Sequence, residues 1–349
     1  MYMKNKKFIS IIWWYHKQIF NFENEQNYHI FPIEVMKEEW YDCEIFAIDS
    51  KVKIEDDPNF IKWTKVIYYK NFLWYLIYLF KNRKNIIYSN SLTIKTLVVW
   101  LIWKKTFFYS HSFPFWNNFI KKIIIQFFYK FFTKIRINNL DEFKKIEKIK
   151  KGLWYICPLS ISNYFLNKNF EKENYWTWIW NLTDIKNPEM LLKLWKKLKE
   201  NNINYKIKII WEDRYNKNWK SFKNLVLENK LENYIELLWY LKPKEIKNIL
   251  NKSLIYLNTS LWEWQCLAVY EWALAWNYLC LQNILSFPSV FWKNAFYHNS
   301  SEELFENIIY IIENKDKFKD KIIQNQNMIL EKYNYEKQKE CLRKMFLEN

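Results

Sequence analysis

In residues 258–281, NTSLWEWQCLAVYEWALAWNYLCL, one strand ends and a loop, a helix and a second strand follow. The first strand ends at Ser260, and a short loop around Glu263 follows it. The next stretch, through Glu271, has the composition of a helix, and a second apolar run begins after Asn277. Because parallel strands need a crossover that is usually a helix, this order predicts a parallel sheet covered by helices.

The same alternation extends along the whole chain. A first series of apolar, strand-length runs lies at 8–12, 43–48, 85–88, 106–110 and 153–157. A second series has strands near Tyr175, Lys206, Tyr234, Ser253 and Asn277. Helix-period segments separate the runs, so the chain is predicted to be α/β, with two Rossmann-like doubly wound domains in tandem.

The boundary between the two series is predicted after residue 160. Pro158 follows the last strand of the first series, and the polar stretch 160–174 has the composition of a linker. The first helix of the second series is predicted to have Asn187 as N-cap and Pro188 at its first position. The charged last segment is predicted to be helical and to fold back on the first domain. The resulting segments are 1–160, 161–325 and 326–349.

The glycine and tryptophan contents are unusual. Glycine occurs once, at Gly152, and tryptophan 21 times, whereas a chain of this length ordinarily has about 24 glycines, roughly 7%. The simplest interpretation is that most of these tryptophans occupy glycine positions of the functioning protein. A UGA codon that is read as glycine in the cell and translated here as tryptophan would produce this exchange.

The positions of individual tryptophans favour this interpretation. Trp13 and Trp14, Trp211 and Trp239 each follow a strand-length apolar run, and Trp276 follows a helical stretch. These are places where tight turns and helix ends favour glycine. The alternative is a chain truly rich in tryptophan, with indoles packed inside apolar faces. Trp74, within NFLWYLIYLF, fits that alternative.

Several classes of protein are excluded by composition. The five cysteines have no CxxC or Cys/His spacing, so neither a disulfide framework nor a zinc site is predicted. No uncharged apolar stretch reaches the roughly 18 residues of a membrane span, and the start has no export signal. We therefore expect a cytoplasmic protein.

The chain is strongly basic, with a formal net charge of +17, of which +12 lies in residues 1–160. Such a charge is typical of a protein with an anionic partner, either nucleic acid or a phospholipid surface. Residues 117–136 interleave lysines with aromatic residues and isoleucines, as in a helix lying on an anionic membrane. Two alternatives stay open: this segment is an ordinary amphipathic helix covering a sheet, or the charge reflects an AT-rich genome.

The loop after Ser260 is a candidate anion site. If Trp264 is glycine, its backbone and the first N–H groups of the following helix suit a diphosphate. Glu263 would then lie at the phosphate end, and Glu271, two helical turns further, is placed to accept hydrogen bonds from a ribose. Taken alone, Glu263 and Glu271 are equally consistent with two exposed acids of an ordinary helix.

With glycine restored, this stretch resembles the E-x7-E signature of the retaining glycosyltransferases of family 4, which have the GT-B fold. Matching positions are Ser260, Glu263, Trp264 (as Gly), Glu271, Ala275 and Trp276 (as Gly). The departures are Gln265 and Cys266, where the family has Phe-Gly in the donor pocket, and Trp272, where it has Ala.

Other matches follow in family order. Residues 178–192 resemble the Gly-Arg loop and the Lys-Gly helix start, which places Lys186 on the donor diphosphate and Asn181 where an arginine is usual. Trp13 and Trp14 resemble the glycine loop beneath the donor phosphates. His111, just past a predicted strand, takes the place of the family's active-site histidine.

The resemblance implies a glycosyltransferase that moves a sugar, with retention and without a metal or other cofactor, from a nucleotide-sugar donor to a glycan or lipid-linked acceptor. Glu263, His111 and Lys186 would be catalytic, at a cytoplasmic site or at the inner face of the plasma membrane, in cell-surface polysaccharide assembly. Two alternatives stay open: a basic, aromatic-rich nucleic-acid-binding protein, and a GT-B protein that binds nucleotide-sugars without transferring them.

Overall fold

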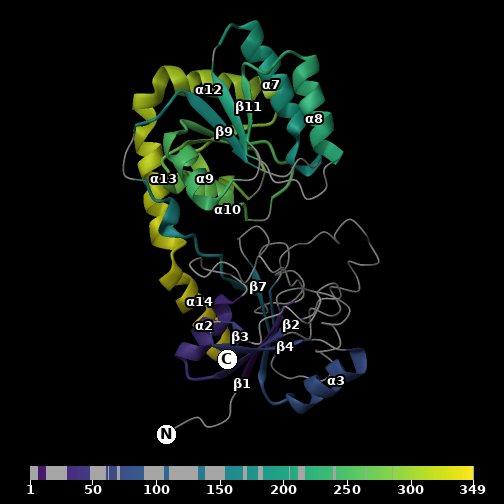
Figure 1. Ribbon diagram of the computed structural model, residues 1–349. Helices are drawn as coiled ribbons and strands as arrows, with labels where there is room; N and C mark the ends of the chain where they lie inside the picture. The colour runs from purple at the N-terminus through teal and green to yellow at the C-terminus, as the bar shows by residue number, and fades with distance from the viewer. Residues whose placement is uncertain are drawn as a thin grey trace. The chain divides into compact units, whose positions relative to one another are not determined.

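The chain forms two compact units, one of residues Met1–Ser160 with Tyr335–Asn349 and the other of residues Ile161–Asn334 (Figure 1). The first unit is therefore discontinuous in sequence. The computed structural model describes residues 7–12, 30–47, 60–61, 63–68, 71–89, 106–109, 133–137, 154–167, 171–179, 184–203, 205–210, 217–238, 241–263, 265–284 and 286–348.

The second unit contains a six-stranded sheet in which every neighbouring pair is parallel. Its strand order is β11-β10-β9-β12-β13-β14, so the order reverses between β9 and β12, as in a doubly wound sheet. The strands are β9 (Tyr175–Ile179), β10 (Lys206–Ile210), β11 (Ile235–Leu238), β12 (Ile255–Asn258), β13 (Tyr278–Gln282) and β14 (Phe296–His298).

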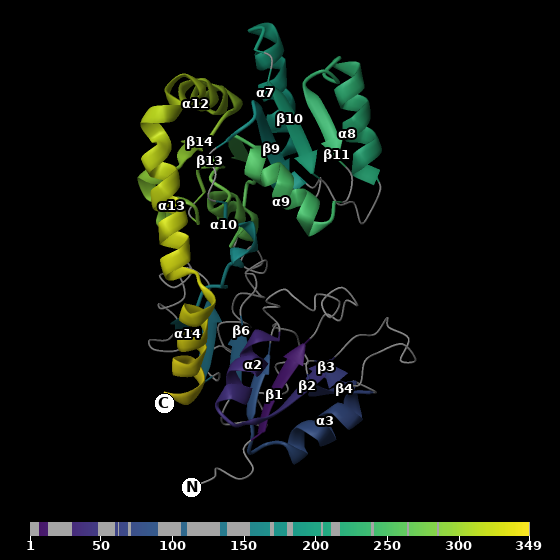
Figure 2. The ribbon, with the colours of Figure 1, turned by 60° about the vertical axis from the view of Figure 1, so that its left-hand side comes forward.

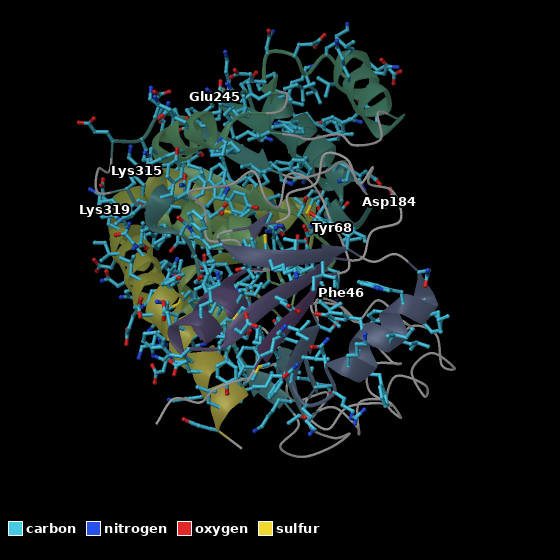
Figure 3. All side chains as sticks on the ribbon, turned by 60° about the horizontal axis from the view of Figure 1, so that its bottom comes forward. Phe46, Tyr68, Asp184, Glu245, Lys315 and Lys319 are labelled. Atoms are coloured by element: carbon cyan, nitrogen blue, oxygen red, sulfur yellow. The ribbon has the colours of Figure 1, made fainter. Side chains whose placement is uncertain are left out.

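Helices connect and cover these strands (Figure 2). They are α7 (Pro188–Glu200), α8 (Lys217–Glu228), α9 (Pro243–Lys252), α10 (Leu267–Leu274), α11 (Pro288–Phe291), α12 (Ser301–Asn314) and α13 (Lys319–Lys332). Helix α9 shows how a sequence signal fixes a helix start. Pro243 occupies the first turn, and the Glu245 carboxylate (Figure 3) accepts a hydrogen bond of 2.8 Å from the Lys242 N–H.

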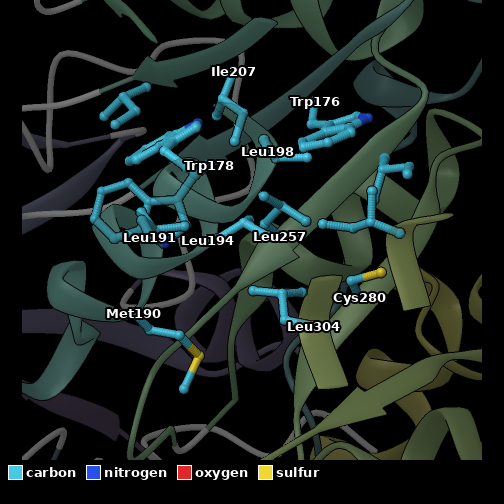
Figure 4. Close-up of a cluster of buried hydrophobic side chains, with 14 of the residues drawn as sticks. Trp176, Trp178, Met190, Leu191, Leu194, Leu198, Ile207, Leu257, Cys280 and Leu304 are labelled. Atoms are coloured by element: carbon cyan, nitrogen blue, oxygen red, sulfur yellow. The ribbon is translucent and has the colours of Figure 1, made fainter. Parts of the chain in front are cut away.

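The core of the second unit forms where α7 covers the sheet. Met190, Leu191, Leu194 and Leu198 recur at helical spacing and are buried. They pack with strand residues that include Trp176, Trp178, Ile207, Leu257 and Cys280 (Figure 4). The apolar stripe of one helix thus closes one face of the parallel sheet, whose strands are apolar because helices cover them.

The first unit contains an eight-stranded sheet in the order β3-β4-β2-β1-β5-β6-β7-β8. All its pairs are parallel except β3 with β4. Phe46 and Tyr68 extend from the neighbouring strands β2 and β4 (Figure 3). The strands are β1 (Lys7–Ile12), β2 (Asp42–Ala47), β3 (Phe60–Ile61), β4 (Thr64–Tyr68), β5 (Ile86–Ser89), β6 (Thr106–Tyr109), β7 (Lys134–Ile137) and β8 (Trp154–Ile156), with helices α2 (Phe31–Glu38) and α3 (Phe72–Lys81).

Helix α14 (Tyr335–Leu347) completes the first unit. The Phe346 ring packs edge-on against Phe8 and Phe107, with centroids 5.1 Å apart in both cases. Arg343 donates to Glu38 and Glu39 of the α2 region at 2.6 Å each. Apolar packing and ion pairs therefore both hold α14. Of the predicted terminal segment 326–349, the part that belongs to the first unit begins at Tyr335.

Asn187 does not have the predicted capping role. It precedes α7, but its side chain makes no capping hydrogen bond, and its backbone is left-handed at φ 49° and ψ 59°. Asparagine tolerates this conformation better than most residues. The residue therefore sets the direction of the chain before Pro188 rather than satisfying the first N–H groups of the helix.

The tryptophans of the described residues include two contrasting groups. Trp40, Trp63, Trp276 and Trp292 have positive φ angles of 62°, 61°, 64° and 42°, which glycine adopts readily and a bulky residue adopts only under strain. Trp176, Trp178, Trp195 and Trp272 are instead fully buried. Trp276 directly follows the C-cap residue of α10, where glycine is common.

Candidate functional site

The carboxyl ends of β9 and β12 meet where the strand order of the second unit reverses. Ligands of doubly wound proteins bind in the crevice outside the strand ends at this point. A short turn, Asp184–Lys186, follows β9 along the chain, and Thr259 to Glu263 follow β12. The Leu261 N–H donates to the Ile185 carbonyl at 2.8 Å, so the two segments lie side by side.

An ion pair joins the two segments. Lys186 Nζ lies 2.5 Å from Glu263 Oε1, and their side chains are only 14% and 8% exposed. Taking both charges out of water is costly unless their geometry and further hydrogen bonds offset the loss of hydration. The pair therefore marks a place where charge is held near the protein interior at the strand ends.

Thr259 fixes the backbone beneath this ion pair. Its hydroxyl donates to the Lys186 carbonyl at 2.7 Å and accepts the indole N–H of Trp178 at 3.1 Å. Asn258 holds the other side of the loop, because its side-chain oxygen accepts the Ser260 N–H at 3.1 Å. All of these residues except Lys186 are fully buried. The loop that bears Glu263 is thus held by hydrogen bonds from the strand end.

The N-terminus of α10 faces this region without a side-chain cap. Its N-cap residue, Cys266, makes no capping hydrogen bond, and burial raises the pKa of its thiol, so the side chain is neutral. The first N–H groups of a helix carry a partial positive charge and bind anions. Together with Lys186, they make the strand ends of β9 and β12 suited to a phosphate group.

The structure places several of the predicted site residues in this region. Lys186 and Glu263 are in direct contact. Gln265 is half-buried in the loop, and Cys266 is buried at the helix start. Glu271 lies on α10 and is also half-buried. The remaining candidates, His111, Trp13, Trp14, Asn181 and Trp264, lie outside the described residues.

Further buried polar groups lie at the ends of the neighbouring strands. His298 ends β14 and stands opposite Gln282 of β13. Burial lowers the pKa of His298 to about 4, against smaller opposing effects of Glu303 and the Asn258 backbone, so its ring is neutral at pH 7. The Ser260 hydroxyl is also buried and makes no hydrogen bond within the described part of the chain. Sequence spacing indicated no role for His298.

Residues 163–328, a little under half of the chain, match the family model of glycosyl transferases group 1. No curated protein sequence matches the chain. TarM of S. aureus is 15% identical with a TM-score of 0.67, and the match covers 80% of this chain but only 59% of TarM.

Two other solved structures match over nearly their full length. Anabaena Alr3699/HepE, solved with UDP, is 10% identical with a TM-score of 0.76, and the match covers 97% of this chain and 99% of HepE. WaaG, described as a glycosyltransferase of lipopolysaccharide biosynthesis, is 9% identical with a TM-score of 0.69, and the match covers 98% and 100%. At these identities the likeness shows the fold, and it confirms the prediction made from the sequence. The two largely parallel sheets and these structural matches agree on a two-domain GT-B fold, and residues 163–328 are similar to the glycosyl transferases group 1.

Proposed function

We propose that this protein transfers a sugar from a nucleotide-sugar donor to a glycan or lipid-linked acceptor with retention of configuration. The observation that carries the proposal is the Lys186–Glu263 pair at the strand-order reversal of the second unit. A lysine held there beside an uncapped helix N-terminus supplies positive charge at the place where doubly wound proteins bind nucleotides.

In this proposal the donor diphosphate binds Lys186 and the first N–H groups of α10, with Trp264 as glycine in the functioning protein. Negative charge grows on the diphosphate as the sugar departs, and preorganised donors stabilise such charge in the transition state. Because Lys186 and the helix supply positive charge, the reaction is proposed to need no divalent metal. Glu263 acts near the transferred sugar, and Glu271 accepts hydrogen bonds from the ribose.

The proposed pathway is cell-surface polysaccharide assembly on the cytoplasmic side of the membrane. Support comes from WaaG, a fold relative described as acting in lipopolysaccharide biosynthesis, and from HepE, solved with UDP and with UDP-glucose. His111, Trp13, Trp14 and Asn181 stay assigned to this function only through the sequence resemblance. We propose that the tryptophans at glycine positions arise from UGA recoding.

The test uses the full chain with glycine in place of the tryptophans that occupy glycine positions. Calorimetry with UDP-, GDP- and ADP-linked sugars is expected to find one donor class that binds, and EDTA is expected to leave its turnover unchanged. Slow hydrolysis of the donor, followed by NMR, is expected to release first the sugar anomer that the donor carried. Release of the opposite anomer would disprove retention, and the absence of any nucleotide-sugar binding would disprove the function.

Binding without any transfer or hydrolysis would favour a non-catalytic protein, and salt-dependent binding of nucleic acid alone would favour the nucleic-acid-binding alternative.

Glu271→Ala is expected to raise the dissociation constant of the nucleotide-sugar by about 10- to 100-fold, because hydrogen bonds to a charged acceptor are worth roughly 1.5–3 kcal/mol. The measurement is calorimetry on the glycine-restored chain. Glu306→Ala, which removes an exposed acid on α12 of the same unit, is the matched control and is expected to leave the affinity unchanged. Equal affinity in both variants would remove Glu271 from the site.

Of the predicted membrane segment 117–136, all but residues 133–136 lie outside the described residues. We also propose that the protein touches an anionic membrane through α3. Phe72, Leu73, Ile77 and Phe80 are exposed on this helix. Lys81, Arg83 and Lys84 follow at its end, and the Arg83 guanidinium lies 4.3 Å from the Phe80 ring centroid. An apolar face bordered by cations suits an anionic interface. No helix in the described ranges is both long and apolar enough to cross a membrane, so the contact proposed is peripheral.

The double substitution Leu73→Glu and Phe80→Glu is expected to weaken binding to vesicles that contain anionic lipid by roughly tenfold or more, since each buried apolar side chain is worth about 1.5–3 kcal/mol. Co-sedimentation at low salt measures the effect. Leu227→Glu, at an exposed leucine of α8 in the other unit, is expected to have no effect. Equal binding of the double variant and the parent chain would contradict the role of α3.

A further inference from the structure

Two cysteines from distant parts of the sequence meet in the first unit. Cys157 follows β8, and Cys341 lies on α14. Their thiols are hydrogen-bonded to each other. The Cys341 thiol also donates to the Ile156 carbonyl at 3.1 Å, and Cys157 Sγ lies 4.0 Å from the Gln338 carbonyl, one helical turn before Cys341. Both sulfur atoms therefore lie between the end of β8 and the same turn of α14.

A buried cation lies beside this pair. Arg136, on β7, is fully buried, and its guanidinium donates to the Cys157 carbonyl at 2.7 Å and the Pro158 carbonyl at 3.3 Å. Burial alone raises the pKa of Cys157, but the hydrogen bond from Cys341 and the charge of Arg136 outweigh burial and lower it. The hydrogen bond to Cys157 raises the pKa of Cys341 in turn. Arg136 and Cys341 thus both favour the thiolate form of Cys157.

The other cysteines have no such environment. Burial raises the pKa of Cys43 to about 12 and also raises the pKa of Cys266 and of Cys280. A neutral thiol is a poor nucleophile, since the thiolate is the reactive form. Cys341 is only partly buried, whereas the other four cysteines are buried. A small molecule in solution therefore reaches the pair through Cys341.

We propose that Cys157 and Cys341 form a reversible intramolecular disulfide by exchange with small disulfides, and that this bond fastens α14 to β8. This inference is independent of the proposed transferase activity. The co-reactant is a low-molecular-weight disulfide, RSSR. Because small thiols reverse such an exchange, the bond is a regulatory modification rather than a permanent crosslink.

The reaction balances as follows. Cys341 passes its proton to the Cys157 thiolate, and the resulting Cys341 thiolate attacks RSSR, which forms Cys341–S–SR and releases RS⁻. The released RS⁻ takes the proton from Cys157. The Cys157 thiolate then attacks the Cys341 sulfur and expels the second RS⁻. The two cysteines are oxidised, and RSSR is reduced to one RSH and one RS⁻.

The disulfide would close a loop that contains the whole second unit. Cys157 lies just before residue 161, where the second unit begins, and Cys341 just after residue 335, where the chain re-enters the first unit. A bond across such a long loop removes much conformational freedom from the unfolded chain. Oxidation is therefore expected to raise the melting temperature of the folded protein.

The experiment uses the full chain with oxidised glutathione, followed by unfolding in denaturant, alkylation of the remaining thiols and mass spectrometry. All five cysteines are expected to be alkylated before oxidation and three afterwards, with Cys157 and Cys341 in one linked peptide. Reductant should restore all five alkylations. The melting temperature of the oxidised chain is expected to exceed that of the reduced chain by on the order of 5 °C.

Three single variants complete the test. Cys157→Ser and Cys341→Ser are each expected to abolish the linked peptide and the shift in melting temperature. Cys280→Ser, which removes a buried cysteine of the second unit, is expected to retain both. If the folded parent chain keeps all its thiols alkylatable after oxidation, or if the linked peptide joins any other pair, the proposal is wrong.

Discussion

Replacing Trp40, Trp63 and Trp292 with glycine is expected to raise the free energy of unfolding by about 1–2 kcal/mol at each site, since this is the cost that a left-handed conformation imposes on a residue with a side chain. These three indoles are 90%, 94% and 70% exposed. Their removal therefore forfeits little packing. The triple variant should be more stable than the parent chain in urea denaturation.

The buried tryptophans should respond in the opposite direction. Trp176 and Trp195 are fully buried in the core of the second unit, and truncating a buried tryptophan costs about 3–5 kcal/mol. Trp176→Gly or Trp195→Gly is thus expected to destabilise the protein by at least that amount. If the exposed positions also lost stability on substitution, the glycine interpretation of those sites would be wrong. Sequencing the codons at both groups gives an independent answer.

Lys186→Ala in the glycine-restored chain is expected to lower kcat by about 100- to 1000-fold, the typical loss when one group that stabilises developing negative charge is removed. Lys186 is held on Glu263 and fixed from below by Thr259, so it is preorganised rather than recruited from solvent. Steady-state kinetics with the donor identified by calorimetry measures the effect.

Two further variants separate a charge effect at the site from a general loss of charge. Lys193→Ala removes an exposed lysine of α7 that also pairs with a glutamate, at 2.9 Å from Glu189, and it is expected to leave kcat unchanged. In the single variant Lys186→Ala, the buried Glu263 carboxylate has lost its lysine. The double variant, Glu263→Gln with Lys186→Ala, removes that carboxylate as well. An unchanged kcat for Lys186→Ala would contradict the assignment of this lysine.

Most strands were predictable from apolar runs, even where a charged residue interrupts them, as in β2 and β10. The predicted runs correspond to β1, β2, β5, β6 and β8 and to five strands of the second unit. Strands β4 and β7 were missed; they carry Lys65, Lys134 and Arg136, which shorten their apolar runs. Arg136 is nevertheless fully buried, because carbonyls after β8 accept its hydrogen bonds. Strand β14 has only two apolar residues before His298, fewer than the run at 153–157 that indicated β8.

The candidate site was predictable where one local stretch carried it. The spacing of Glu263 and Glu271 drew attention to the loop and helix after β12, and the Lys186 match came from a separate stretch after β9. Lys186 and Glu263 meet at 2.5 Å because β9 and β12 are neighbours in the sheet. No local sequence pattern predicts that strand order. Thr259 was missed, although it directly precedes Ser260 at the strand end. Its role depends on Lys186 and Trp178, which reach it only across the folded sheet.

The discontinuity of the first unit affects the order in which the protein acquires structure during synthesis. Residues Ile161–Asn334 form a continuous unit that is translated completely before α14. The N-terminal sheet, although translated first, lacks the Phe346 ring and the Arg343 ion pairs until the last residues emerge. Domains made during translation usually mature from the N-terminus onward, whereas here the N-terminal sheet receives its last helix only after the second unit has been translated.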